Sequence, residues 1–324
     1  MADQKIDVLL YGLGAIGSFY AFILSRSENV RLTVVARSNY DAVAANGLRI
    51  ISQNHGEHLV KPHKVLRKVA DAGMTFDYVV CAHKAIYQDT VPEQIAAGVD
   101  GGKTTVVIIQ NGVGNEEPFR DSFPSATIIS CVTWVGARQS EPGVVEHTKS
   151  EDMQIGLFAN ASGDAAADAQ RLDAFAGLLT AGGTVFQAVP DIQLLRWEKV
   201  VWNAAWNSLT TLTLADTHAW LVSSESAEPM TRRLMGEVMA VGRALGVPLA
   251  DDLPDRLMGR IRALPPIGSS MRADYEAGRP LEVEIILGYP VRKGKELGVP
   301  VPIVETLYVL LTAVNKRLIA ASKM

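Results

Sequence analysis

A polar stripe on a predicted helix is the segment of this chain best suited to chemistry. Lys199, Asn203 and Asn207 follow one another at intervals of four residues, so they drift only about 80° around a helix. Valine, alanine and tryptophan surround them, so these polar groups are expected to be buried and to need partners, of which a bound substrate is one. A desolvated lysine has a lowered pKa and can act as a general acid that protonates a developing alkoxide. The alternative is structural, with Lys199 extending to solvent and the asparagines capping neighbouring helices.

A second polar group of residues contains a hydroxyl and a carboxylate. Ser270 follows a Gly-Ser pair, and Glu282 lies 12 residues later, after the sequence Gly-Arg-Pro-Leu. The two side chains can reach one site only if the helix between them turns back. Their spacing alone does not require this.

A glycine turn near the beginning of the chain has the sequence context of a dinucleotide-binding fingerprint. It follows an apolar strand pattern and opens an apolar helix. In such a turn the first glycine permits the tight bend, the second lets a pyrophosphate approach the backbone, and the third allows close helix packing, while the helix N-terminus faces the phosphates. A purely structural turn is the alternative. The predicted cofactor-binding residues here are Gly12, Leu13, Gly14, Ala15, Ile16 and Gly17.

The residue after the second predicted strand indicates which dinucleotide is bound. An NAD site has Asp or Glu about 20 residues beyond the glycines, but this chain has Arg37. An arginine there favours the 2′-phosphate of NADPH, with Ser38 and Asn39 as auxiliary donors. The alternative is a solvated surface arginine. Lys84 and Asn111 follow two later strands, at the sheet edge where ligands of open α/β folds bind, and each has a loop-forming alternative.

The elements that must position these residues change in type halfway along the chain. The first half alternates short β-branched runs with helical stretches, which predicts a parallel sheet covered by helices. The predicted strands are 6–11, 32–36, 78–82, 104–109 and 127–132, followed by a more antiparallel hairpin region at 143–158, a helix at 164–181 and a strand at 184–189. After Pro190 the pattern is all-helical, with helices at 223–243, 253–264 and 302–318. We therefore predict an α/β protein with a Rossmann-type domain over 1–190 and an all-helical domain over 191–324.

Composition narrows the class of protein. The chain has 324 residues and a formal net charge of −4, which argues against a nucleic-acid partner because phosphate binding needs a basic patch. Cys81 and Cys131 lie in apolar strand runs without metal-ligand spacing, so we expect buried thiols and no metal. Neither a leader nor a membrane-spanning run is apparent, so a cytoplasmic location is expected. The helix at 302–318 is either a core helix or a dimer face, which leaves a monomer or a homodimer open.

The ordered motifs together resemble those of the ketopantoate reductase family, also called 2-dehydropantoate 2-reductases. The similarity runs through the whole chain, in the segments GLGAIG, HKA, QNGVG, EPGVVEH, WEKVVWNAAWN and SSMRADYEAGRPLEVEIILG. It implies a Rossmann domain followed by a helical domain. The glutamine after the HKA segment is displaced by one position, so either Tyr87 or Gln88 could meet the cofactor.

The resemblance implies a role for each candidate residue. Lys199 falls on the catalytic lysine. Asn203, Asn207, Ser270 and Glu282 fall on substrate-binding residues, and Asn111 on an asparagine shared by substrate and cofactor. Arg37 and Lys84 match basic residues that recognise the NADPH phosphate.

The implied activity is that of an oxidoreductase. The expected reaction is NADPH-dependent reduction of 2-dehydropantoate to (R)-pantoate, a step of pantothenate biosynthesis, with NADP⁺ as the other product. The alternatives are a paralogous reductase of another small keto acid and, more remotely, a non-enzymatic NADPH sensor. Trp202 and Trp206 add bulk beside the polar stripe and leave the keto acid itself open.

Overall fold

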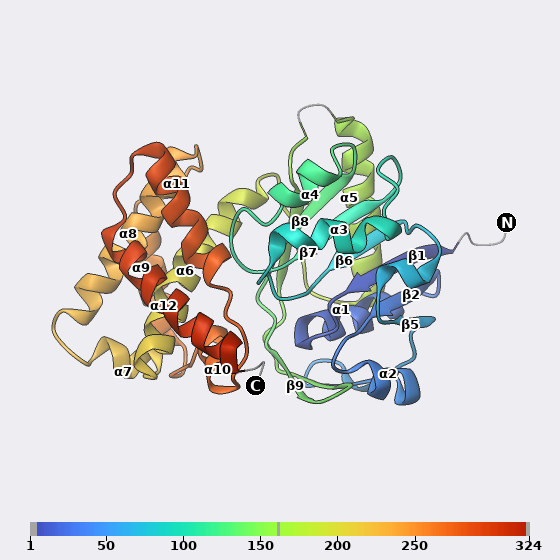
Figure 1. The fold of residues 1–324 in the computed structure, drawn as a ribbon, viewed down its shortest axis with the longest axis horizontal. Coiled ribbons are helices and arrows are strands. Elements are labelled where there is room, and N and C mark those ends of the chain that lie inside the picture. The colour runs from blue at the N-terminus through green and yellow to red at the C-terminus, as the bar shows by residue number, and fades with distance from the viewer. Residues whose placement is uncertain (1–4, 161–162, 322–324) are drawn as a thin grey trace. The chain divides into compact units, whose positions relative to one another are not determined.

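A computed structural model describes residues 5–160 and 163–321. The chain forms two compact units (Figure 1). The first contains the residues up to Gln110 together with Asn115–Ile192, and the second contains Asn111–Gly114 together with the residues from Gln193 onwards. The short segment Asn111–Gly114 therefore belongs to the second unit, although the residues on both sides of it in the sequence belong to the first.

The first unit is built on an eight-stranded sheet of order β12-β11-β8-β7-β6-β1-β2-β5. The strands from β5 to β8 in this order are parallel, and β11 pairs antiparallel with β8. The predicted parallel sheet is thus confirmed. The strands are β1 (Ile6–Tyr11), β2 (Val30–Val35), β5 (Lys64–Leu66), β6 (Tyr78–Cys81), β7 (Thr105–Ile109), β8 (Thr127–Thr133), β11 (Met153–Leu157) and β12 (Gln187–Ala188).

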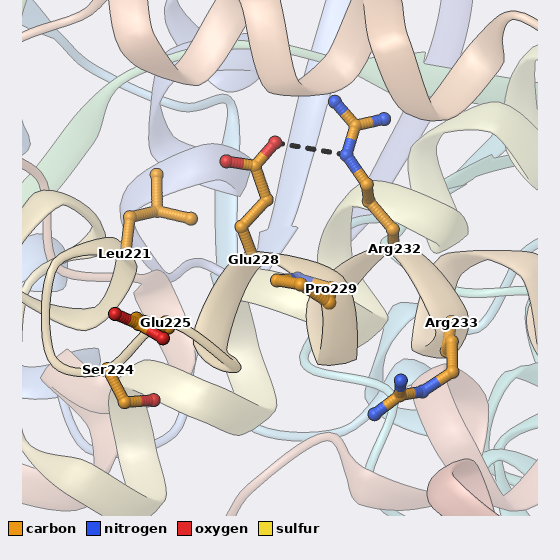
Figure 2. A pocket seen from close by; sticks show the side chains of 7 residues that line it. All are labelled: Leu221, Ser224, Glu225, Glu228, Pro229, Arg232 and Arg233. Atoms are coloured by element: carbon orange, nitrogen blue, oxygen red, sulfur yellow. Dashed lines mark hydrogen bonds and ion pairs between the residues drawn. The ribbon is translucent and has the colours of Figure 1, made fainter.

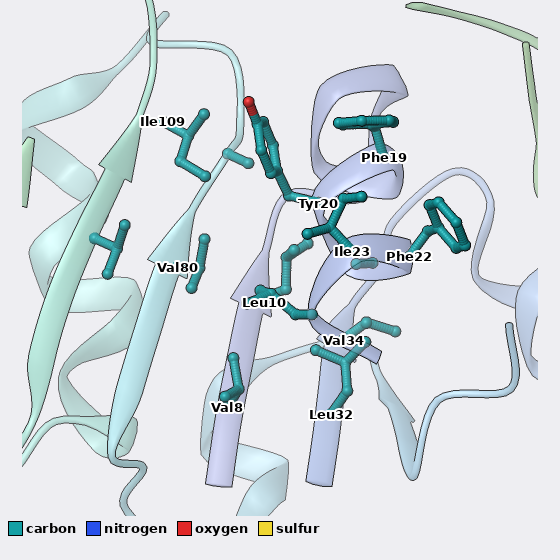
Figure 3. Close-up of a cluster of buried hydrophobic side chains, with 14 of the residues drawn as sticks. Val8, Leu10, Phe19, Tyr20, Phe22, Ile23, Leu32, Val34, Val80 and Ile109 are labelled. Carbon is teal, nitrogen blue, oxygen red and sulfur yellow. The ribbon is translucent and has the colours of Figure 1, made fainter. Parts of the chain in front are cut away.

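Helices cover both faces of this sheet because its strands alternate buried side chains between two apolar clusters. Val8 and Leu10 of β1 pack with α1 (Ala15–Ser25) and α5 (Ala165–Gly182), as Figure 3 shows for α1. Leu9 and Tyr11 point to the opposite face, where α3 (Val91–Ile95) and α4 (Glu117–Ser122) lie. A strand buried on both faces is typical of a doubly wound sheet. Cys81 and Cys131 are both buried in these strands, as predicted.

The remaining short elements of the first unit connect these layers. They are α2 (Tyr40–Asn46) and three 3-10 turns at Val69–Ala72, Gln88–Thr90 and Ala96–Gly98. The helix predicted at 164–181 is confirmed as α5, and its N-cap Asp164 accepts hydrogen bonds from the backbone N–H groups of Ala166 and Ala167.

The first unit also contains a second sheet, of order β4-β3-β10-β9, which the sequence patterns did not predict. Its strands are β3 (Leu48–Ser52), β4 (Gly56–Val60), β9 (Ala137–Glu141) and β10 (Val144–His147). The predicted hairpin region at 143–158 is wrong in its pairing, because β10 joins this sheet while β11 joins the large one. Both strands do pair antiparallel with a neighbour, but β10 also pairs parallel with β3, a contact between distant segments that local patterns do not encode. The strand predicted at 184–189 shortens to β12.

The second unit is helical throughout its described residues. Its elements are α6 (Ile192–Thr213), α7 (Thr217–Leu221), α8 (Ala227–Ala244), α9 (Leu253–Ala263), α10 (Ser270–Glu276), a π-helical turn (Glu284–Gly288), α11 (Tyr289–Leu297) and α12 (Pro302–Ala321). Every residue of α6 from Lys199 to Thr211 is buried. Helix α12 packs one face inwards through Val304, Leu307 and Leu311, which favours the core interpretation of 302–318. No helix among the described residues is both long and apolar enough to cross a membrane.

Candidate functional site

The glycine turn of the first unit leaves open space at one glycine and none at the other two. Gly12 has a φ of +101°, and a Cβ there would lie 2.4 Å from the backbone nitrogen of His83. A Cβ on Gly17 would lie 1.9 Å from the carbonyl oxygen of Gly12. A Cβ on Gly14 would meet nothing within 4 Å. Gly14 is also the N-cap of α1 and has no side chain to accept from the first turn, so the turn fits a phosphate-bearing ligand.

Residues after β2 support this turn. Asn39 is buried, and its Nδ2 donates to the carbonyl oxygen of Leu13 at 2.7 Å. The amide predicted as an auxiliary phosphate donor therefore fixes the glycine turn instead. Arg37 and Ser38 are exposed beside it. An exposed guanidinium next to a glycine turn fits a terminal phosphate group.

A buried polar network joins the ends of β6 and β7. Gln110 donates through Nε2 to the carbonyl oxygen of His83 at 2.9 Å, and Gln88 donates through Nε2 to Oε1 of Gln110 at 2.7 Å and to the carbonyl oxygen of Asn115 at 3.1 Å. Gln88 thus braces these loops, whereas Tyr87 is 61% exposed and Lys84 is exposed.

His83 is neutral at pH 7 in this network. The pKa of its imidazole is lowered to about 4, chiefly by burial and in smaller part by the charge of Arg37, while the hydrogen bond with Gln88 opposes the lowering. Its Nδ1 is buried and has no hydrogen-bond partner among the described residues. Sequence patterns did not single out His83, since a histidine after a strand has no distinguishing spacing.

The polar stripe predicted on α6 is buried. Lys199, Asn203 and Asn207 are 8%, 6% and 4% exposed. Nδ2 of Asn203 is buried and, within the described part of the chain, has no hydrogen-bond partner. Because an unpartnered buried amide is costly, this group fits a ligand oxygen.

Lys199 has the electrostatic environment of a proton donor. The pKa of its ammonium is lowered to about 7: burial is the largest cause, the nearby charges of Arg196 and Arg260 act in the same direction, and the carboxylate of Glu282 opposes them. A group with this pKa exchanges protons readily at neutral pH. The structure thereby brings two predicted residues, Lys199 and Glu282, into one electrostatic environment.

Asn111 reaches the same unit through the loop after β7. Its Nδ2 lies 3.5 Å from Oε2 of Glu282. The backbone N–H of Val113 donates to the carbonyl oxygen of Ile285 at 3.0 Å, and the buried Arg196 donates to the carbonyl oxygen of Gly112 at 2.9 Å. The role of Arg196 was missed, although its position three residues before Lys199 places it on a neighbouring part of the helix face.

Ser270 is not joined to these residues. It is exposed at the first position of α10, and the hydroxyl that meets α6 is that of Ser269, which accepts from Oγ1 of Thr210 at 2.8 Å and from the backbone N–H of Arg272 at 3.1 Å. The sequence has Ser-Ser at this point. Which hydroxyl caps the helix depends on the tertiary contact with α6.

The second unit also carries a cavity of about 630 Å³ between α7 and α8. Two of its side chains form an ion pair, in which Nε of Arg232 lies 3.0 Å from Oε1 of Glu228 (Figure 2). None of the predicted site residues lines it. Its lining residues are Leu221, Ser224, Glu225, Glu228, Pro229, Arg232 and Arg233. Among the described residues no cluster of three or more His, Cys, Asp or Glu side chains could hold a metal ion.

Comparison with known proteins places these features in a family. Residues 8–160 match the family described as "Ketopantoate reductase PanE/ApbA", and residues 191–315 match "Ketopantoate reductase PanE/ApbA C terminal". The chain is 27% identical to a 2-dehydropantoate 2-reductase of Nostoc sp., over 95% of this chain and 94% of the relative.

Solved structures agree with this assignment. A 2-dehydropantoate 2-reductase from Methylococcus capsulatus is 31% identical with a TM-score of 0.85, covering 97% of this chain and 98% of that one. A D-mandelate dehydrogenase solved with NADH and anilino(oxo)acetate shares the fold at 23% identity, with a TM-score of 0.83 over 97% and 99% of the two chains. Both family matches, together with the near-complete coverage of the Methylococcus structure, show that this chain belongs to the ketopantoate reductase family of oxidoreductases.

Proposed function

We propose that this protein reduces 2-dehydropantoate to (R)-pantoate with NADPH. The observation that carries the proposal is Lys199, a buried lysine whose pKa is about 7, within a chain of the ketopantoate reductase family. Reduction of a carbonyl needs one hydride and one proton, and an ammonium with this pKa supplies the proton at neutral pH.

Each candidate site residue of the second unit has a proposed role in this reaction. Lys199 donates its proton to the oxygen at C2 of the keto acid as that oxygen becomes an alkoxide. Asn203 donates from Nδ2 and orients the carbonyl together with Asn207. Glu282 accepts a hydrogen bond from the substrate hydroxyl, with Asn111 beside it at 3.5 Å. Ser270 contacts the substrate from the beginning of α10, where it is exposed.

The first unit binds the cofactor. NADPH, when bound, supplies the hydride for C2 of the keto acid. The open space at Gly14 and the N-terminus of α1 accept the pyrophosphate, within the segment Gly12, Leu13, Gly14, Ala15, Ile16 and Gly17. Arg37 and Lys84 bind the 2′-phosphate, and the exposed position of both supports that role. We also propose that the two domains meet near residue 190 of the sequence and that the protein is cytoplasmic.

A second candidate is a paralogous reductase of another small keto acid. It is favoured by Trp202 and Trp206, whose rings lie 5.9 Å apart on the helix that carries Lys199 and add bulk there. Such an enzyme uses the same lysine and cofactor, so a panel of keto acids distinguishes the two.

The test is consumption of NADPH by the purified protein with 2-dehydropantoate, followed at the nicotinamide absorbance band. We expect turnover, and a loss of about 10²- to 10⁴-fold in kcat for Lys199→Ala with retained NADPH binding. Faster turnover of another keto acid supports the paralogue. NADPH binding without oxidation by any keto acid supports a sensor, and unchanged turnover in the variant removes Lys199 from its role.

Cofactor preference has its own test. Arg37→Ala should weaken NADPH binding by about 10- to 100-fold and leave NADH binding unchanged, since only NADPH offers the phosphate for a charge-assisted hydrogen bond. Arg31→Ala is the matched control, because Arg31 lies on β2, the strand that Arg37 follows, and pairs with Asp7 of β1. Equal losses for both dinucleotides in the Arg37 variant would contradict the phosphate role.

A further inference from the structure

Arg196 is a buried arginine on the same face of α6 as the proposed proton donor. It is 2% exposed and stands three residues before Lys199. At about 100° per residue, positions 196, 199 and 203 fall within about 60° of one another around the helix, so Arg196 extends the polar stripe by one turn towards the beginning of α6. Burying a guanidinium is costly unless it is hydrogen-bonded, so a charge in this position indicates a specific contact.

That contact is with the loop that carries Asn111. Nη1 of Arg196 donates to the carbonyl oxygen of Gly112 at 2.9 Å. A second bond holds the same loop to the π-helical turn, where the backbone N–H of Val113 donates to the carbonyl oxygen of Ile285 at 3.0 Å. The loop is therefore fastened to two separate elements, and Arg196 supplies the fastening to α6.

The two fastenings decide where Asn111 lies. Its Nδ2 is 3.5 Å from Oε2 of Glu282, and Glu282 stands three residues before Ile285. The bond to Ile285 therefore fixes the loop relative to the carboxylate of Glu282. The bond from Arg196 fixes the loop relative to α6, and so relative to Lys199.

The guanidinium also places a permanent positive charge near Lys199. Arg196 of α6 and Arg260 of α9 lower the pKa of the Lys199 ammonium, and the carboxylate of Glu282 raises it. After burial, Arg196 has the largest effect on this pKa. Because an arginine stays protonated at every pH at which the protein is folded, its influence on Lys199 does not change with pH.

We propose that Arg196 is a positioning residue of the reductase site, which fastens the Asn111–Gly114 loop to α6 and keeps a fixed positive charge one helical turn before Lys199. The inference rests on the proposed function and deepens it. In this role Arg196 acts through two other residues. It sets the place of Asn111 among the proposed substrate-binding groups, and it makes the proton of Lys199 easier to release.

Three variants separate the hydrogen bond from the charge. Arg196→Gln keeps a side-chain donor without the charge, Arg196→Lys keeps the charge without the planar donor edge, and Arg196→Met removes both. The control is Arg256→Met. Arg256 also pairs with α6, through Glu198 at 2.8 Å, but it does so from an exposed position on α9.

The charge is tested by NMR titration of the full-length protein labelled with ¹³C at lysine Cε, with the Lys199 resonance assigned by its absence from Lys199→Arg. The Lys199 pKa should rise from about 7 by about one pH unit in Arg196→Gln and Arg196→Met, because a like charge has been removed. It should stay near the wild-type value in Arg196→Lys. The pH at which kcat/KM begins to fall should move in parallel.

The fastening is tested by amide hydrogen exchange of the Asn111–Gly114 segment and by KM for 2-dehydropantoate. Both the exchange rate and KM should increase by about tenfold in Arg196→Met, and by less in Arg196→Gln and Arg196→Lys, since each of these keeps a donor for the carbonyl oxygen of Gly112. Arg256→Met should change neither.

An unchanged Lys199 titration in Arg196→Gln would overturn the proposal, and so would unchanged exchange or unchanged KM in Arg196→Met. Equal effects in Arg256→Met would also overturn it. An arginine that served stability alone would lower the free energy of unfolding in its variants and leave the Lys199 titration where it is. Absence of turnover in the wild type would reject the proposed substrate, whereas the titration and the exchange would still test Arg196, because neither needs substrate.

Discussion

Lys199 is an ionisable side chain in a buried position, and its burial is the main reason that its pKa is lowered. Its ammonium is desolvated on a helix that is buried on every side, and the charges of Arg196 and Arg260 add to that effect. Glu282 compensates only in part. A lysine with an unperturbed pKa near 10.4 would be a much weaker acid at neutral pH.

The pH dependence of turnover follows from this pKa. In the proposed reaction the reduction requires protonated Lys199, so kcat/KM for the keto acid should be constant below about pH 7 and fall towards tenfold per unit above it. The reverse oxidation requires the neutral amine and should rise through the same pH. Initial rates in both directions across pH 5.5–9 check this, and parallel profiles in the two directions would contradict it.

At the scale of elements, the glycine turn that links β1 to α1 contains three glycines that differ in how much space a side chain would have. Gly12 and Gly17 lie against backbone atoms, whereas Gly14 borders open space. Close packing and ligand approach are therefore separable by mutation within one turn.

A matched pair of variants separates these roles. Gly17→Ala should lower the free energy of unfolding by about 1–3 kcal/mol and weaken NADPH binding, because its Cβ would lie 1.9 Å from the Gly12 carbonyl oxygen. Gly14→Ala should leave stability nearly unchanged and weaken NADPH binding alone. Urea unfolding and nucleotide titration measure both, and full nucleotide binding in Gly14→Ala would remove the pyrophosphate from this position.

For the whole molecule, the order of the chain does not coincide with its two units. The loop Asn111–Gly114 leaves the first unit after β7 and packs within the second, through the bonds from Val113 to Ile285 and from Arg196 to Gly112. This loop carries Asn111 to Glu282. Two residues far apart in sequence thus belong to one set of side chains, for which we propose substrate binding.

Gly112 tests the importance of that loop. It has a φ of +91°, and a Cβ would lie 2.5 Å from the carbonyl oxygen of Ile285, so Gly112→Ala should cost about 2–4 kcal/mol and reduce turnover more than NADPH binding. Gly73→Ala is the control, because its φ is +63° but its Cβ would meet nothing within 4 Å. Equal effects of the two variants on unfolding and turnover would show that backbone strain alone is responsible.

The sequence by itself determined the features that depend on local patterns. The strand, turn and helix around Gly12, the parallel α/β pattern, and the four-residue spacing of Lys199, Asn203 and Asn207 are all set within a few residues. Strand and helix periodicities are properties of neighbouring residues, so they can be read without a structure. The same applies to Arg37 at the end of β2, whose proposed phosphate role follows from its place in the fingerprint.

Only the tertiary structure decided the contacts between distant segments. The parallel pairing of β3 with β10, the approach of Asn111 to Glu282, the hydrogen bond from Arg196 to Gly112 and the use of Ser269 rather than Ser270 at α10 have no local signature. Each depends on which surfaces meet when the core is packed. Periodicity fixes which face of an element is apolar, but the partner that this face meets is selected by the whole fold.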